Sequence, residues 1–140
     1  MIKRVWIPGI IFGLVLNLYS AITCLGLFRW IYLDEPMGVL NPLILKLAPS
    51  WILIFGLLNL VFSVIFVFLY SLIHKNIPGK GIFKGINFSL FVFLLWFVFF
   101  LKTYISMTLS PMLFLYWSIN TLIAISMLGI LTSIFFDKYK

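Results

Sequence analysis

The sequence predicts an all-α polytopic membrane protein, built as a bundle of four transmembrane helices with both termini in the cytoplasm. Hydrophobic residues make up 64% of the 140 residues and charged residues only 9%, whereas a soluble domain carries roughly a quarter charged residues. The mean hydropathy is +1.23. A chain this short cannot enclose so much apolar surface in one aqueous core, so we expect lipid to be its solvent.

The third observation behind this fold class is the central stretch of the chain. A basic connector rich in glycine, residues 74–85, leads into the apolar run 86–104, and no charged residue lies between Gly85 and Leu101. Spans of about 20 residues cross a bilayer. We therefore expect a single transmembrane domain over residues 1–140, with spans at about 5–33, 50–73, 86–104 and 112–136.

The first predicted span follows Lys3 and Arg4 and ends in an interfacial collar of Arg29, Trp30 and Tyr32. A basic start before an apolar run is also typical of a signal sequence. The run is long for the apolar core of such a signal, so we interpret it as a retained span.

The loop after the first span begins at Asp34. Residues 36–47 are apolar but too short to span, and a half-helix in the membrane interface is an open alternative for them. The second span, 50–73, carries Trp51 and Tyr70 near its two interfaces.

Aromatic residues dominate the third span, where Phe, Trp and Tyr fill eight of the nineteen positions in 86–104. Lys102 lies near its outer end, where a long side chain reaches the head groups. The fourth span, 112–136, carries Tyr116 and Trp117 near the outer interface.

The basic residues predict the orientation of these spans. Seven fall on one side of the membrane and three on the other, which also holds the acidic Asp34 and Glu35. The seven are Lys3, Arg4, Lys75, Lys80, Lys84, Lys138 and Lys140, and the three are Arg29, Lys46 and Lys102. Because basic residues accumulate on the cytoplasmic side, we expect the protein in the cell (inner or plasma) membrane with cytoplasmic termini.

The net charge of +7 indicates a partner for this side of the protein. The basic residues stand at the ends of apolar runs, so anionic lipid head groups are the expected contacts of Lys75, Lys80 and Lys84. No basic helix or aromatic sheet motif for nucleic acid is present, so no nucleic-acid partner is expected.

Each predicted span carries one asparagine: Asn17, Asn59, Asn87 and Asn120. Asn17 and Asn59 lie near mid-depth, Asn120 lies toward the outer side, and Asn87 lies near the inner surface. An unpaired amide is costly in hydrocarbon, so we predict that Asn17, Asn59 and Asn120 face one another in a polar layer. Hydrogen bonding between helices is the favoured role, and a lining for a small solute is the alternative.

The sequence offers no set of residues for catalysis, for a cofactor or for a metal. Cys24 is the one cysteine and His74 the one histidine, and the three acids, Asp34, Glu35 and Asp137, stand outside the apolar runs. A zinc site needs three or four protein ligands, and an acid pair or nucleophile–base set cannot be assembled. We therefore expect no catalytic residue, no cofactor and no metal.

The connector Ile77-Pro78-Gly79-Lys80-Gly81-Ile82-Phe83-Lys84-Gly85 resembles that of a group of uncharacterised small four-helix integral membrane proteins of bacteria and archaea. In that group a Pro-Gly-Lys-Gly connector leads to a Lys-Gly pair and a glycine-rich third helix. This chain has Asn87 and Ser89 where glycines are expected. The resemblance implies the four-helix fold and supplies no activity.

These features predict a non-enzymatic accessory or structural subunit that packs in a larger membrane assembly. Its partners would be membrane lipids and other membrane subunits or further copies of itself. The alternative is a homo-oligomeric channel or carrier for a small or apolar solute, which would use the asparagine layer. An enzyme acting on a lipid or quinone is the third interpretation.

Overall fold

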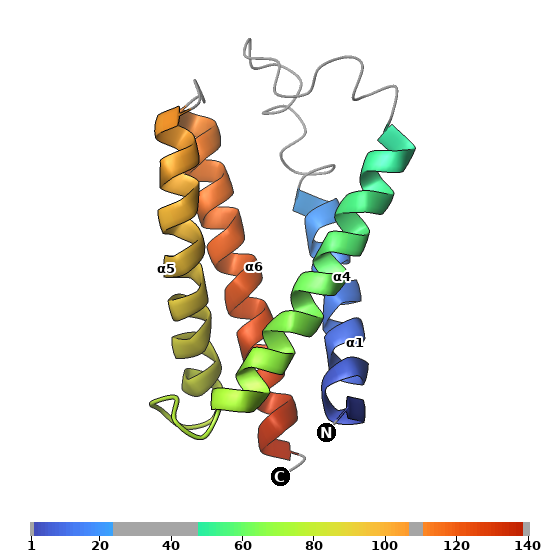
Figure 1. Ribbon diagram of the computed structural model, residues 1–140, viewed down its shortest axis with the longest axis vertical. Coiled ribbons are helices and arrows are strands. Elements are labelled where there is room, and N and C mark those ends of the chain that lie inside the picture. Colours follow the sequence, from blue (N-terminus) through green and yellow to red (C-terminus); the bar gives the residue numbers. More distant parts are fainter. Residues whose placement is uncertain (1, 24–47, 107–110, 139–140) are drawn as a thin grey trace.

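The computed structural model describes residues 2–23, 48–106 and 111–138, and these residues are helical except for the turn at 74–81. The helices are α1 (Ile2–Ser20), α4 (Ala48–Ile73), α5 (Ile82–Ser106) and α6 (Pro111–Lys138). All four are long and apolar enough to cross a membrane. This confirms the all-α class and the four helices of spanning length (Figure 1).

The helix bounds differ from the predicted spans in two places. Helix α1 begins at Ile2 and continues as a wider turn to Thr23, while residues 24–33 of the predicted first span lie outside the described residues, as does the segment 36–47. Helix α5 begins at Ile82, not at residue 86. The connector is therefore 74–81, shorter than the predicted 74–85.

Glycine conformation explains the early start of α5. Gly79 and Gly81 have φ angles of +104° and +54°, a backbone region that glycine enters without a steric penalty. The Lys84 N–H then donates to the Gly81 carbonyl at 3.1 Å, which begins the helix. Lys84 and Gly85 were expected in the connector but belong to the first turn of α5.

The four helices form two antiparallel hairpins, α1 with α4 and α5 with α6. Helix α6 also touches both α1 and α4. The start of α1, the connector and the end of α6 lie together at one end of the molecule, here called the connector end (Figure 1). From there α4 and α5 diverge toward the opposite end, here called the far end.

The α1–α4 hairpin is joined through glycines. A Cβ on Gly9 would lie 2.9 Å from the Val64 Cα, and one on Gly13 would lie 3.0 Å from the Leu60 Cα. Each four-residue step along α1 matches a four-residue step back along α4. The absence of side chains at these positions lets the two backbones approach, as small residues do at membrane helix contacts.

The α5–α6 hairpin is closer still. A Cβ on Gly85 would overlap the Gly129 carbonyl, and one on Gly129 would overlap the Ser89 hydroxyl. The Ser89 Oγ donates to the Ile125 carbonyl at 2.8 Å and is fully buried. This hydrogen bond and the glycine contact fix the register of the two helices.

Aromatic rings join the two hairpins at the connector half of the molecule. Phe88 of α5 packs edge-on against Phe66 and Tyr70 of α4, with ring centroids 4.8 and 5.3 Å apart. The rings of Tyr70 and Phe136 lie 5.6 Å apart and those of Phe12 and Phe135 lie 6.2 Å apart. We call this group the ring cluster: Phe12, Phe66, Tyr70, Phe88, Phe135 and Phe136.

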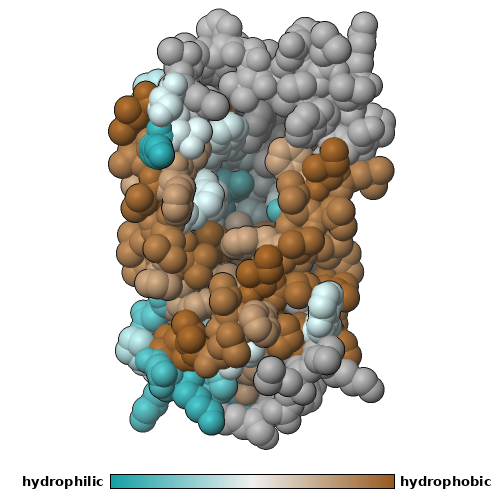
Figure 2. All heavy atoms as spheres, viewed as in Figure 1, coloured by the Kyte–Doolittle hydropathy of each residue, from teal (hydrophilic) through white to brown (hydrophobic). Residues whose placement is uncertain are grey.

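The outer surface of the helices is apolar. Large hydrophobic side chains are exposed on all four helices, for example Trp6, Leu53, Phe99 and Ile123. On the face shown in Figure 2, hydrophobic residues form a band over the helices, and hydrophilic residues gather at the connector end. Such a band is the surface that a bilayer covers.

The glycine contacts predict that alanine has opposite effects on stability at two glycine positions. Alanine normally stabilises a helix by about 1 kcal/mol relative to glycine. We expect Gly129→Ala to destabilise the protein, because the new methyl group overlaps Ser89. We expect Gly56→Ala to be neutral or stabilising, because its nearest neighbour is the Asn17 Oδ1, 3.8 Å away.

Thermal unfolding in a mild detergent, followed by circular dichroism, measures both variants. Gly85→Ala serves as a second test of the same contact, because its methyl group would overlap the Gly129 carbonyl. Equal stability of the Gly129→Ala variant and the parent protein would contradict the observed helix spacing.

Candidate functional site

The predicted polar residues of α1 and α4 meet. The Asn59 Nδ2 donates to the Asn17 Oδ1 at 2.8 Å and lies 3.4 Å from the Ser20 Oγ. The Asn17 Nδ2 donates to the Gly56 carbonyl at 3.1 Å. Both amides are half-buried. Asn17 therefore uses its donor and its acceptor on the same neighbouring helix.

Asn120 of α6 joins this level of the bundle through a residue that the sequence analysis did not select. The Tyr19 hydroxyl donates to the Asn120 Oδ1 at 2.7 Å and lies 3.4 Å from the Asn120 carbonyl oxygen. Asn120 is not hydrogen-bonded to Asn17 or Asn59 among the described contacts. Helix α1 is the intermediary, with Asn17 and Ser20 turned to α4 and Tyr19 turned to α6.

The signal that could have identified Tyr19 is its depth. Tyrosine in membrane proteins concentrates at the interfaces, and Tyr19 stands inside an apolar run next to Asn17. A phenol placed there needs a hydrogen-bond partner. We call the set Asn17, Tyr19, Ser20, Asn59 and Asn120 the polar layer.

Two groups of the polar layer keep hydrogen-bonding capacity. An amide offers two N–H donors and a carbonyl acceptor. Over residues 2–23, 48–106 and 111–138, the structure records no acceptor for the Asn120 Nδ2 and no donor to the Asn59 Oδ1. Such groups are expensive to leave unpaired in an apolar medium, so the polar layer can accept one further neutral, hydrogen-bonding partner.

The fourth asparagine, Asn87, has a different role. Its Nδ2 donates to the Pro78 carbonyl at 2.9 Å, and the side chain is exposed. This bond ties the connector to the first turns of α5. Asn87 is therefore a turn-stabilising residue at the connector end and lies apart from the polar layer.

The three connector lysines lie at the connector end of the molecule. Lys75 and Lys80 are exposed, and Lys84 is half-buried in the first turn of α5. His74 lies beside them and its Nδ1 is 2.9 Å from the Ser71 carbonyl, while its ring stacks on Tyr70. Contact of these lysines with anionic lipid stays a prediction.

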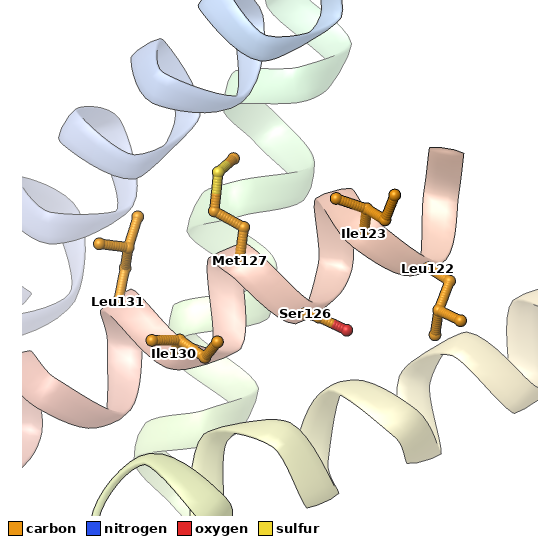
Figure 3. A pocket seen from close by; sticks show the side chains of 6 residues that line it. All are labelled: Leu122, Ile123, Ser126, Met127, Ile130 and Leu131. Atoms are coloured by element: carbon orange, nitrogen blue, oxygen red, sulfur yellow. The ribbon is translucent and has the colours of Figure 1, made fainter. Parts of the chain in front are cut away.

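A shallow groove of about 500 Å³ runs along α6. Figure 3 shows its lining, which comes entirely from this helix: Leu122, Ile123, Ser126, Met127, Ile130 and Leu131. The lining is aliphatic apart from the Ser126 hydroxyl. A surface of this kind accommodates an acyl chain or an apolar side chain, and it offers no charged group.

The chemistry available at these places is hydrogen bonding and apolar contact. The described residues contain no group of three or more His, Cys, Asp or Glu side chains able to hold a metal. The polar layer itself consists of amide and hydroxyl groups, which donate and accept hydrogen bonds.

Comparison with known proteins adds no assignment. No family model, no curated protein and no solved structure matches the chain.

The polar layer gives a second prediction. We expect leucine at Asn17, Asn59 and Asn120 together to lower the thermal stability in detergent, because hydrogen bonds between three helices are lost. Each such bond contributes about 0.6 to 1 kcal/mol in a membrane protein. Unchanged stability of the triple variant would mean that the polar layer does not hold the helices together.

Asn87→Ala is the matched control for this experiment. It also removes one amide–carbonyl hydrogen bond, but the bond lies at the exposed connector, where water replaces it at little net cost. A loss of stability in the control as large as that in the triple variant would contradict a special role for the polar layer.

Proposed function

We propose that the protein is a non-enzymatic integral protein of the cell membrane that serves as an accessory or structural subunit of a larger membrane assembly. The observation that carries this proposal is the use of the polar groups. Asn17, Asn59 and Asn120 bond to neighbouring helices of the same chain. Polar side chains used in this way support helix packing more than solute transfer.

The ring cluster supports the same role. It fills the space between the hairpins on the connector side of the polar layer, with Phe66, Tyr70 and Phe88 almost fully buried. A solute path through a single chain would have to displace these rings. Packing of this kind favours a rigid scaffold over a pore within one chain.

The exposed apolar surface provides the area on which a larger membrane protein would pack. Phe83, Val98, Phe99 and Ile105 on α5 each expose more than half of their surface. In a bilayer these side chains face lipid or another helix, and van der Waals packing between helices drives association there.

We further propose that the connector end faces the cytoplasm. Lys75, Lys80, Lys84 and Lys138 lie at this end, and α1 also begins there. Among the described residues, Lys102 is the basic residue near the far end. The accumulation of lysines at one end supports the cytoplasmic assignment by the positive-inside rule.

The groove along α6 supports the second candidate, a homo-oligomeric channel or carrier for a small or apolar solute. A groove of about 500 Å³ falls in the size range of small-molecule sites. Two copies of the groove facing each other would enclose a path outside the ring cluster. The two candidate functions differ in the composition of the native complex: a larger membrane protein in the first, further copies of this chain in the second.

The native particle distinguishes the two candidates. With a tag at the C-terminus, mild-detergent extraction and native mass spectrometry, we expect a stoichiometric complex with a larger membrane protein. A monomer or homo-oligomer would contradict the accessory role and favour the channel or carrier. Gly129→Ala is expected to lose the complex through its misplaced α5–α6 hairpin, and Gly56→Ala to retain it.

Cysteine labelling tests the orientation. In a Cys24-free background, we expect a cysteine at Gly79 to be protected from a membrane-impermeant thiol reagent in intact cells, because the connector is cytoplasmic. A cysteine at Gly38 should react. Labelling after permeabilisation is the control that both cysteines can react, and the reverse pattern in intact cells would overturn the orientation.

A further inference from the structure

Helix α6 has one face that α1, α4 and α5 leave uncovered. Side chains three or four residues apart lie on the same side of a helix, and isoleucines and one serine recur along α6 at this spacing. We call this face the α6 seam: Ile119, Ile123, Ser126, Ile130 and Ile134. The exposed fractions of Ile119, Ile123 and Ile134 are 57%, 51% and 48%. The α6 seam therefore lies on the outer surface of the bundle.

The groove of about 500 Å³ lies at the middle of the α6 seam. Its lining comes from α6 alone, and in Figure 3 the short Ser126 side chain stands among longer apolar ones. Ser126 also lies near the middle of α6, Pro111–Lys138, and so at the depth of the hydrocarbon in a bilayer. The groove is a hollow in which the side chains of another helix can pack.

The Ser126 hydroxyl is unpaired. Three other hydroxyls of α6 donate to carbonyl oxygens of the same helix at 2.7 to 2.9 Å, those of Ser118, Thr132 and Ser133. No hydrogen bond of the Ser126 hydroxyl is recorded in the part of the chain that the structure describes. Thr121 also lacks one there, but it stands seven residues before the buried Leu128 and so on the inner face of α6. Ser126 therefore presents an unpaired hydroxyl to hydrocarbon, which is costly.

The unpaired hydroxyl indicates what kind of molecule covers the groove. An acyl chain fills apolar space but offers no hydrogen-bonding group. A serine hydroxyl both donates and accepts, so a second serine at the same depth satisfies it. Copies of one chain inserted in the same orientation place each residue at the same depth, and a closed twofold dimer brings like residues together across its axis. No charged residue lies between Pro111 and Phe136, so like charges do not oppose this contact.

We propose that the α6 seam is a dimer interface, on which a second copy of this chain packs in parallel so that the Ser126 hydroxyls of the two copies bond to each other. One hydroxyl donates to the other, and the accepting serine donates to the Leu122 carbonyl of its own helix, a bond that serine forms readily in helices. The Ile123 and Ile130 side chains of each copy fill the groove beside Ser126 of the other. Isoleucine has one strongly preferred rotamer in a helix, so this packing loses little side-chain entropy.

This inference goes beyond the accessory role proposed above and does not rest on it. An accessory subunit of this kind would enter the larger assembly as a pair. A dimer closed at the α6 seam also fills the grooves, whereas the channel or carrier needs an open space between them. The isolated protein tests the dimer and the native particle tests the accessory role, so the failure of one proposal does not entail the failure of the other.

The first experiment measures the dimer dissociation constant of the isolated protein in vesicles of phosphatidylethanolamine and phosphatidylglycerol. Cys24 is replaced by serine, and Lys80, which is exposed at the connector end, is replaced by cysteine for labelling with a donor or an acceptor fluorophore. Energy transfer is followed over a series of protein-to-lipid ratios. We expect the transfer to fall on dilution with lipid, as a reversible dimer requires, and a monomer at every ratio would overturn the proposal.

Variants at Ser126 test the contact itself. Ser126→Ala should raise the dimer dissociation constant about threefold, the effect of losing one hydrogen bond of average strength between membrane helices. Ser126→Trp should abolish the dimer, because its side chain fills the groove and keeps the two helices apart, while in the monomer it faces lipid. Thr121→Val is the matched control, because it removes a hydroxyl from the inner face of the same helix, and the dissociation constant should stay unchanged.

Disulfide crosslinking tests the position of the interface. In the Cys24→Ser protein, Ser126→Cys places one thiol at the centre of the α6 seam, and Leu94→Cys places one on the exposed face of α5. A disulfide forms only where the two Cα atoms are within about 7 Å, so it reports direct contact. Oxidation with copper phenanthroline in membranes of expressing cells, where all copies share one orientation, should crosslink Ser126→Cys into a dimer and leave Leu94→Cys monomeric.

Other occupants of the groove would overturn the proposal. A protein that is monomeric in vesicles and retains a phospholipid in native mass spectrometry, but loses it in Ser126→Trp, would assign the groove to an acyl chain. A protein that is monomeric in vesicles, but whose native complex is lost in Ser126→Trp, would assign the groove to the larger membrane protein. Energy transfer that Ser126→Trp leaves unchanged would place the dimer contact on another face.

Discussion

Close approach of helix backbones is the constraint on which this structure depends. In a bilayer the hydrophobic effect does not drive helices together, and dispersion contacts and hydrogen bonds must do so. The chain meets this requirement with glycine and serine at four-residue spacing, Gly9 with Gly13 on α1 and Gly85 with Ser89 on α5. The bulky aromatic residues then fill the space between the two hairpins. At that position they do not separate the two helices within either hairpin.

The polar layer follows from the same geometry. Because Gly9 and Gly13 bring α1 close to α4, the Asn17 amide reaches the Gly56 carbonyl as well as the Asn59 side chain. The Ser63 hydroxyl lies fully buried beside Gly13 and has no hydrogen-bond partner among the described residues. Packing therefore determines which polar groups are satisfied, and the hydrogen bonds refine an arrangement already set by the small residues.

Composition and apolar runs were sufficient to predict the helices, because lipid permits few other structures for a short apolar chain. The amide positions of Asn17 and Asn59 were also readable from their depth. The pairing of the helices could not be predicted from the sequence. Every span has a face of small and weakly polar residues, and each such face could pack against several of the other helices. The role of Tyr19 was not predicted, because it depends on the position of α6. Lys84 and Gly85 were assigned to the connector, because the φ angles of Gly79 and Gly81, which set the start of α5, cannot be derived from the apolar pattern.

The hairpin architecture has a consequence for synthesis in the membrane. The glycine contacts and the Asn17–Asn59 hydrogen bonds of α1 and α4 lie within the first 73 residues of the chain. This half can therefore reach its own packing while the ribosome is still producing α5 and α6, since chains fold from the N-terminus during translation. The ring cluster needs both halves, so its formation marks the completion of assembly.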